Sequence, residues 1–113
     1  MMANISPIEA LGDPTRRKLF EHLRQGPCSV TELISIVPIS QPAVSQHLKV
    51  LRAARLVKVE KRGQQRIYHL NPAGLAELRH YVESLWDDVL QAFGEEAERM
   101  ADAEQNAKSE SQK

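Results

Sequence analysis

Two short helices separated by a tight turn are the feature that most constrains how this sequence folds. Ser29 with Glu32 three residues later has the pattern of a capping box, which predicts a helix over about 30–36. Pro38 ends that helix, because proline lacks a backbone donor and clashes with the preceding turn. The break is short, so a following helix must pack close to the first.

The following helix is predicted over about 41–55, with Ser40 as its N-terminal cap. Pro42 is tolerated in its first turn because the N–H groups there have no helical partner. A short helix, a tight turn and a second helix form a helix-turn-helix.

A β-hairpin follows directly. Residues 57–62 and 65–70 alternate apolar and polar side chains, and Gly63-Gln64 lies between them. A hairpin in this position is a wing, so the fold class is mainly α with a β-hairpin wing: a winged helix-turn-helix.

Further helices are predicted on both sides of this unit. Asp13 caps a helix that begins at Pro14, and a short amphipathic helix precedes it. A long helix runs from 72 to about 97. We expect residues 1–97 to form one DNA-binding and dimerisation domain, and 98–113 to be a disordered polar tail.

Composition excludes several classes of protein. The 113 residues contain no apolar run of membrane-spanning length and no secretory signal pattern, so we expect a cytoplasmic protein that does not enter the membrane. A single cysteine excludes a disulfide within the chain and a multi-cysteine metal site. No nucleophile, base and orienting group occur together, so an enzyme is not expected.

Charge is distributed unevenly although the net charge is zero. Residues 1–70 carry 11 Lys and Arg against 5 Asp and Glu, whereas 71–113 carry 4 against 10. No acidic residue lies between Glu32 and Glu60. This pattern favours a polyanionic partner for the first part of the chain.

The second helix of the helix-turn-helix has two distinct faces. Val44, Leu48 and Leu51 form a core-facing stripe, and the opposite face carries only neutral polar and basic residues. Gln pairs bidentately with adenine, and Lys and Arg bind phosphates. The residues predicted to contact double-stranded DNA from this helix are Ser40, Gln41, Pro42, Ser45, Gln46, Lys49 and Arg52.

The hairpin tip is basic and amide-rich, as expected of a wing that lies along a phosphate backbone or enters a minor groove. Its predicted DNA contacts are Lys61, Arg62, Gln64, Gln65 and Arg66.

The last helix has a coiled-coil-like apolar seam and a second apolar stripe, which indicates a partner subunit as well as its own domain. The residues predicted at the homodimer interface are Ile5, Ile8, Leu75, Leu78, Val82, Leu85 and Val89. A two-fold dimer places its recognition helices about 34–36 Å apart, so the operator should be an imperfect inverted repeat.

Three motifs in order resemble those of the ArsR/SmtB group of bacterial repressors. Residues 11–17 resemble the group's opening motif, 40–51 its recognition helix and 62–72 its wing, within a similarity over about 5–95. The resemblance implies a homodimer that represses by blocking a promoter, either its own or that of other genes, under the control of an effector that the sequence does not identify.

This sequence departs from the group at its metal sites. Metal-sensing relatives often carry paired cysteines in the first helix of the helix-turn-helix, but 31–37 contains no thiol. The positions that hold a second type of site are occupied by Pro72, Gly74, Leu85 and Asp88. No metal and no cofactor are therefore expected. Arg55 replaces a glycine common in relatives, which puts in doubt the local geometry after the recognition helix.

Two alternatives remain open. His80, Glu83 and Asp87 share a helix face that could hold zinc, and Cys28 lies at a helix start that could lower its pKa, so a metal- or redox-responsive repressor is possible. The other alternative is a winged-helix module that binds proteins rather than DNA.

Overall fold

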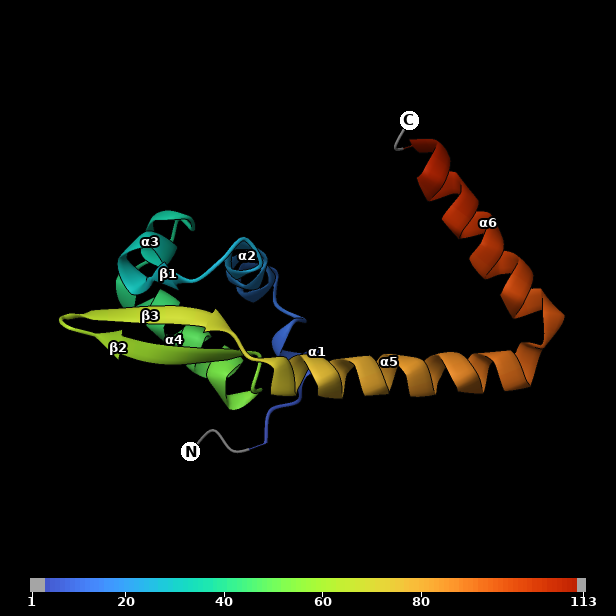
Figure 1. Ribbon diagram of the computed structural model, residues 1–113, viewed down its shortest axis with the longest axis horizontal. Helices are drawn as coiled ribbons and strands as arrows, with labels where there is room; N and C mark the ends of the chain where they lie inside the picture. Colours follow the sequence, from blue (N-terminus) through green and yellow to red (C-terminus); the bar gives the residue numbers. More distant parts are fainter. Residues whose placement is uncertain (1–3, 112–113) are drawn as a thin grey trace. The chain divides into compact units, whose positions relative to one another are not determined.

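The computed structural model describes residues 4–111 and confirms the winged helix-turn-helix (Figure 1). It divides into two compact units, one ending at Leu78 and one beginning at Arg79. The elements in chain order are α1 (Pro7–Ala10), α2 (Pro14–Leu23), β1 (Cys28–Ser29), α3 (Val30–Ser35), α4 (Gln41–Ala53), β2 (Val57–Arg62), β3 (Gln65–Leu70), α5 (Pro72–Phe93) and α6 (Glu95–Ser111).

Polar caps fix the starts of three helices where the sequence predicts them. Asp13 Oδ2 accepts a hydrogen bond from the Arg16 backbone N–H (3.0 Å) at the start of α2. Ser29 Oγ and Ser40 Oγ accept from the third residue of α3 and of α4, at 3.2 and 3.3 Å. Each cap satisfies a donor that has no partner within the helix, and it therefore sets where the helix begins.

The wing belongs to a three-stranded antiparallel sheet in the order β1-β3-β2. The predicted hairpin is confirmed in register, with Arg62 opposite Gln65 and Gly63 at a φ of +59° in the two-residue turn. The strand β1, in which Cys28 pairs with Tyr68, was not predicted. Two residues are too few for strand alternation to appear in a sequence.

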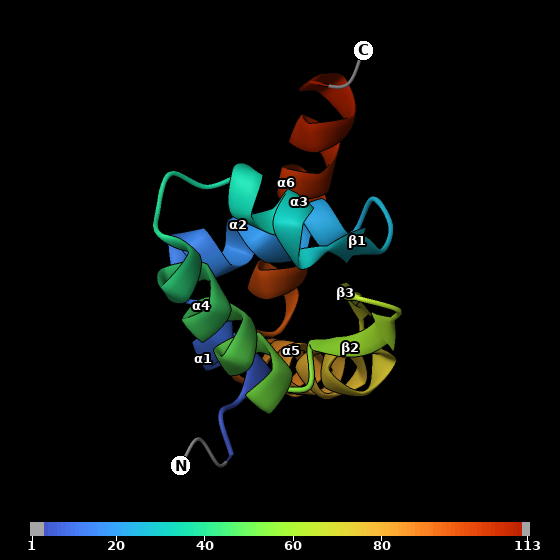
Figure 2. The ribbon, with the colours of Figure 1, turned by 90° about the vertical axis from the view of Figure 1, so that its left-hand side faces the viewer.

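One apolar core holds the helix-turn-helix against the sheet. Leu19 of α2, Leu33 of α3, Leu48 and Leu51 of α4, and Leu56 before β2 are all fully buried. In the view of Figure 2, α4 and the wing lie below α2 and α3. Because α4 and β2 both contribute residues to this core, the core sets their relative position.

The turn between α4 and the wing is unusual and tightly packed. Arg55 has a φ of +60°, the left-handed conformation that glycine adopts more readily. Its carbonyl accepts a hydrogen bond from the Gly74 N–H (2.8 Å), and its guanidinium pairs with Glu77. The Leu56 carbonyl accepts from the Asn71 N–H (2.9 Å). These contacts join the start of the wing to the start of α5.

The structure differs from the sequence prediction at the C-terminal end. A long helix to about 97 and a disordered tail over 98–113 are predicted, whereas α5 ends at Phe93 and α6 spans Glu95–Ser111. Gly94, at a φ of +54°, separates the two helices. Polar composition suggested disorder, but Ala, Glu, Gln and Lys are good helix formers and acidic residues favour a first helical turn.

Residues 112–113 of the predicted tail lie outside the described residues. Among the residues that the structure describes, no helix has the length and apolar character needed to span a bilayer.

The contact at Gly74 makes the first prediction. A β-carbon at this position would lie 2.1 Å from the Arg55 carbonyl oxygen, which is backbone and cannot rotate away. We expect Gly74→Ala to lower the free energy of unfolding by about 3 kcal/mol, as overpacking in a tight contact does. Urea denaturation measures this, with exposed Ala76→Gly as a control that should cost only about 1 kcal/mol. Stabilisation by Gly74→Ala, the usual result in a helix, would contradict this packing.

Candidate nucleic-acid interface

The helix α4 presents one polar and basic face to solvent. Val44, Leu48 and Leu51 are fully buried, which fixes the rotation of the helix about its axis. The side chains of the opposite face are therefore exposed, and none of them is acidic. They are Gln41, Pro42, Ser45, Gln46, Lys49 and Arg52, with Ser40 exposed at the N-terminal cap.

Arg16 of α2 joins α1 and α4 through its guanidinium group. Arg16 Nε donates to the Ala10 carbonyl (2.7 Å), and its Nη1 lies 3.3 Å from His47 Nδ1 of α4. Asp13 Oδ2 is 3.9 Å from the same His47 nitrogen. The backbone hydrogen bond from Arg16, followed by the charges of Arg16 and His47, lowers the pKa of Asp13 despite opposing desolvation. These contacts tie His47 of α4 to the side chains at the start of α2.

Two cations face each other across the wing. Strand residues alternate between the two faces of a sheet, so Lys61 lies on the same face as Val57 and Val59, which pack in or against the core. Arg66 is paired directly opposite Lys61 and shares that face. Like charges in this position destabilise a hairpin. Their presence favours a role in binding an anion over a role in stability.

The basic side chain of Arg62, next to Lys61 in sequence, lies on the other face of the wing. Arg62 Nη2 is 3.4 Å from a carboxylate oxygen of Glu60, two residues earlier on the same strand. Glu60 is an exposed acidic residue close to the basic tip, and its pairing with Arg62 was not predicted from the sequence. The pairing partly neutralises Arg62, whereas Lys58, Lys61 and Arg66 have no carboxylate partner within salt-bridge distance among the described residues.

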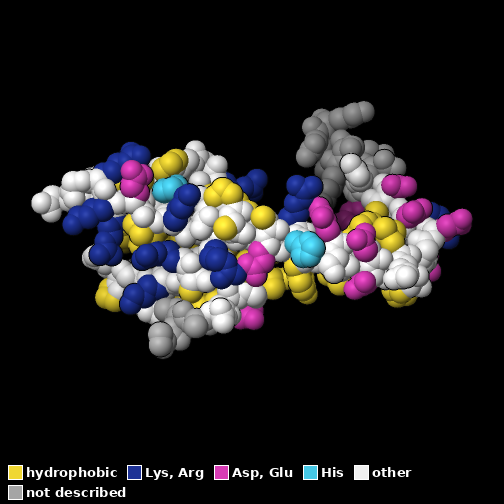
Figure 3. Space-filling view, turned by 60° about the horizontal axis from the view of Figure 1, so that its bottom comes forward, with side chains coloured by type: hydrophobic (Ala, Val, Ile, Leu, Met, Phe, Trp, Pro, Cys, Tyr) yellow, Lys and Arg dark blue, Asp and Glu magenta, His cyan; other side chains and the backbone are white. Residues whose placement is uncertain are grey.

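All predicted wing residues, including Gln64 and Gln65, are exposed. Figure 3 shows the Lys and Arg side chains gathered on the unit that contains the wing, whereas the acidic side chains are concentrated on the other unit. The exposed face of α4 is therefore free of acidic side chains, and the wing tip is predominantly basic.

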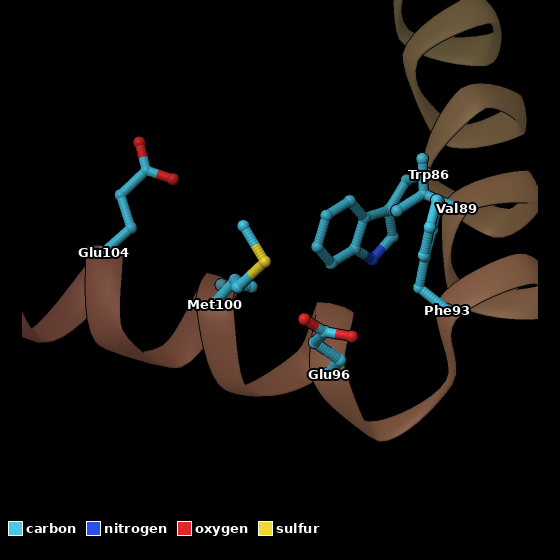
Figure 4. Close-up of a pocket in the computed structure, with 7 residues that line it drawn as sticks. Trp86, Val89, Phe93, Glu96, Met100 and Glu104 are labelled. Carbon is cyan, nitrogen blue, oxygen red and sulfur yellow. The ribbon is translucent and has the colours of Figure 1, made fainter.

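The residues predicted at the homodimer interface differ in how exposed they are in the single chain. Val82 and Leu85 of α5 and Ile8 of α1 are about half exposed, whereas Ile5 and Leu75 pack partly against the core of their own chain. Leu78 and Val89 are partly buried. A pocket of about 420 Å³ lies between the end of α5 and α6, where Trp86, Phe93 and Met100 face one another (Figure 4).

The structure does not assemble the metal site suggested for the last helix. His80, Glu83 and Asp87 line one shallow hollow with Ser84 and Asp88, but Glu83 is paired with Arg79 (2.7 Å). Their ligand atoms are not among those within 4.8 Å of one another in the described part of the chain.

The suggestion that a helix start lowers the pKa of Cys28 is wrong. The thiol is buried, and this burial raises its pKa to about 12, with the hydrogen bond to Glu32 and the charge of Glu32 adding to the shift. A redox role that depends on a reactive thiolate is therefore not supported.

Comparison with known proteins now defines the family. The model for bacterial regulatory proteins of the arsR family matches residues 13–59. The HTH-type transcriptional regulator Rv2034 of Mycobacterium tuberculosis is 47% identical over 87 residues, which cover 77% of this chain and 81% of that protein. The chain belongs to the ArsR family. The transcriptional repressor SdpR of Bacillus subtilis is 33% identical over 70 residues, covering 62% of this chain and 78% of SdpR.

A solved structure agrees with this assignment. The crystal structure of a possible transcriptional regulator for arsenical resistance has a TM-score of 0.69 and 42% identity, and the match covers 74% of this chain and 86% of that one. The ArsR family consists of DNA-binding transcriptional regulators rather than enzymes, and its relatives include named repressors. The predicted class of a DNA-binding repressor is confirmed for this ArsR-family protein.

The pKa of Cys28 makes the second prediction. At pH 8 only about one thiol in ten thousand is ionised if the pKa is about 12. We expect alkylation by iodoacetamide to be at least about 100-fold slower in the native protein than in urea, and its rate to rise with pH throughout the range in which the fold persists. Mass spectrometry of quenched samples measures the rate. Equal rates in the native and unfolded protein would show that the thiol is not protected in this way.

Proposed function

We propose that this protein is a cytoplasmic homodimeric repressor that binds an inverted-repeat operator through α4 and the wing. The observation that carries the proposal is the exposed face of α4, which contains amide, hydroxyl and basic side chains but no carboxylate. A helix that enters the major groove passes between two rows of phosphates, where an acidic side chain would be repelled. An ordinary surface helix usually carries both signs.

Side chains along α4 are assigned different roles according to their chemistry. Gln41 and Ser45 lie in the N-terminal turns, the part of a recognition helix that reaches base edges. Gln41 can accept from and donate to adenine, and the Ser45 hydroxyl can contact several bases. Lys49 and Arg52 lie further along the same exposed face and are assigned to phosphates. Phosphate contacts position the protein without reading sequence.

The wing adds a second phosphate contact. Lys61 and Arg66 repel each other in the free protein, and a phosphate between them would remove that repulsion. Arg62 must exchange its pairing with Glu60 for any contact with DNA, so its net contribution should be smaller. The wing is thus proposed to bind the backbone through Lys61 and Arg66.

A second subunit is proposed to cover the exposed apolar stripe of α5. Val82, Leu85 and Trp86 are 42 to 52% exposed in the single chain, and Ile8 of α1 is 46% exposed. Contiguous exposed apolar residues on a soluble protein indicate an interaction surface. A two-fold partner at this surface would supply the second recognition helix that an inverted repeat requires.

The experiment that tests the proposed function is selection of binding sites from a pool of random duplexes. We expect an imperfect inverted repeat with half-sites about one helical turn apart. Recovery of the upstream region of the protein's own gene would additionally indicate autoregulation. A single short asymmetric site, or no enrichment at all, would contradict the proposal.

Arg66 provides a prediction about affinity. We expect Arg66→Ala to weaken binding to all duplexes alike and to reduce the slope of log affinity against log salt by about 0.9, because one phosphate contact is lost. Fluorescence anisotropy at several salt concentrations measures both effects. The matched control is Arg24→Ala, an exposed arginine paired with Glu21 on α2, which should change neither quantity.

Stability offers a second readout for Arg66. Because Lys61 lies opposite, we expect Arg66→Ala to leave the free energy of unfolding unchanged or to raise it by a few tenths of a kcal/mol. A destabilised variant would mean that Arg66 serves the hairpin rather than DNA.

Gln41 provides a prediction about sequence preference. We expect Gln41→Ala to reduce discrimination between the selected operator and a duplex changed at one base pair by about 1–3 kcal/mol, with little change in affinity for unrelated DNA. Anisotropy competition measures the difference, with exposed Gln91→Ala of α5 as the control. Unchanged discrimination would remove Gln41 from the residues that read bases.

A further inference from the structure

Three side chains with metal-binding atoms meet where α2, β1 and α3 come together. His22 lies at the end of α2, Cys28 on β1 and Glu32 in the first turn of α3. One ligand atom from each lies within 4.8 Å of the other two, and no other such group occurs in the described part of the chain. These elements appear near one another in both Figures 1 and 2.

We propose that His22, Cys28 and Glu32 form a binding site for a divalent metal ion of the zinc class, with a fourth coordination position open. Nitrogen, sulfur and carboxylate oxygen are the donors that zinc takes in proteins. A tetrahedral ion at ordinary zinc–ligand distances separates its donors by about 3.3–3.6 Å. His22 Nε2 and Glu32 Oε2 start 2.9 Å apart, and the other pairs of ligand atoms lie within 4.8 Å of each other. Each of these distances therefore needs to change by only about 1 Å to fit a tetrahedral ion.

The carboxylate of Glu32 is directed toward this site instead of completing a capping box. Ser29 Oγ accepts from the Glu32 N–H, as the sequence predicts, but the Glu32 side chain bonds to His22. A carboxylate oxygen and an imidazole nitrogen therefore already face each other at this point, as two ligands of one ion would.

Two of the three ligands are partly exposed to solvent, whereas the third is buried. The side chains of His22 and Glu32 are 27% and 53% exposed, so an ion can enter from solvent. Cys28 is only 7% exposed and lies behind them. A cation held by the outer pair would supply the positive charge that a buried thiolate needs, and the thiol proton would leave to solvent as the metal–sulfur bond forms.

The site shares helix α3 with one of the family's metal sites, but its ligands are Glu32 with His22 and Cys28 from outside that helix rather than paired cysteines within it. It joins the end of α2 to the first helix of the helix-turn-helix and to β1, which pairs with wing strand β3. An ion bound only by the folded chain would stabilise it in proportion to its occupancy.

The test is a titration of the full-length protein with cobalt(II), a spectroscopic substitute for zinc. We expect a thiolate-to-cobalt charge-transfer band in the near ultraviolet at one ion per chain, lost on addition of zinc. The band should be absent in Cys28→Ala and strongly weakened in His22→Gln. The matched control is His80→Gln, which alters the other His and carboxylate hollow and should leave the band unchanged.

Cys28 is buried, so its replacement can affect folding, whereas His22 lies at the surface and its replacement should not. Circular dichroism confirms the fold of each variant, and zinc should raise the melting temperature of the wild type but not of His22→Gln. No thiolate band in the wild type would overturn the proposal. A band that persists in Cys28→Ala, or that disappears in His80→Gln, would also overturn it.

Discussion

The packing of Gly74 against the Arg55 backbone is the contact on which the geometry of the proposed DNA-binding surface depends. It fixes a left-handed residue at the end of α4 and, with the hydrogen bond from Asn71 to Leu56, joins the start of β2 to the start of α5. A left-handed arginine costs free energy that surrounding contacts must offset, and here the ion pair with Glu77 and the backbone bond to Gly74 do so. The recognition helix and the wing are thereby held in one orientation relative to the core. A surface that contacts two parts of a duplex requires this rigidity.

The electrostatic design follows from that geometry. Burial of Val44, Leu48 and Leu51 leaves α4 with an exposed face free of carboxylates, and the wing places Lys61 opposite Arg66 at its tip. Neither the absence of carboxylates from the α4 face nor the pairing of two cations on the wing improves the stability of the free protein. Both lower the free energy of a complex with a polyanion, because each cation that contacts a phosphate releases a condensed counterion. Most of the acidic residues lie instead on the second unit, and among the exposed residues of α4 and the wing only Glu60 is acidic.

Local signals in the sequence predicted much of this fold. The caps at Asp13, Ser29 and Ser40 and the hairpin around Gly63 appear where simple rules place them, because they depend only on neighbouring residues. The sequence could not show β1, whose two residues form a strand only because Tyr68 lies beside them. The direction of the Cys28 pKa shift depends on burial, and the meeting of His22 with Glu32 depends on the fold, which brings the end of α2 beside the first turn of α3. Helix α6 was missed because polar composition outweighed helix propensity in the prediction. The sequence also could not show which face of the wing each cation lies on, because this depends on the strand register.

The central claim is that the exposed face of α4 and the wing tip contact DNA. The most direct measurement is the change in backbone amide chemical shifts when the full-length protein binds the duplex recovered by site selection. The account predicts that the largest changes fall on residues 40–52 and 61–66, with smaller changes over 79–104. Largest changes on α5 and α6, with 40–52 and 61–66 unaffected, would contradict the account and place the partner on the other unit.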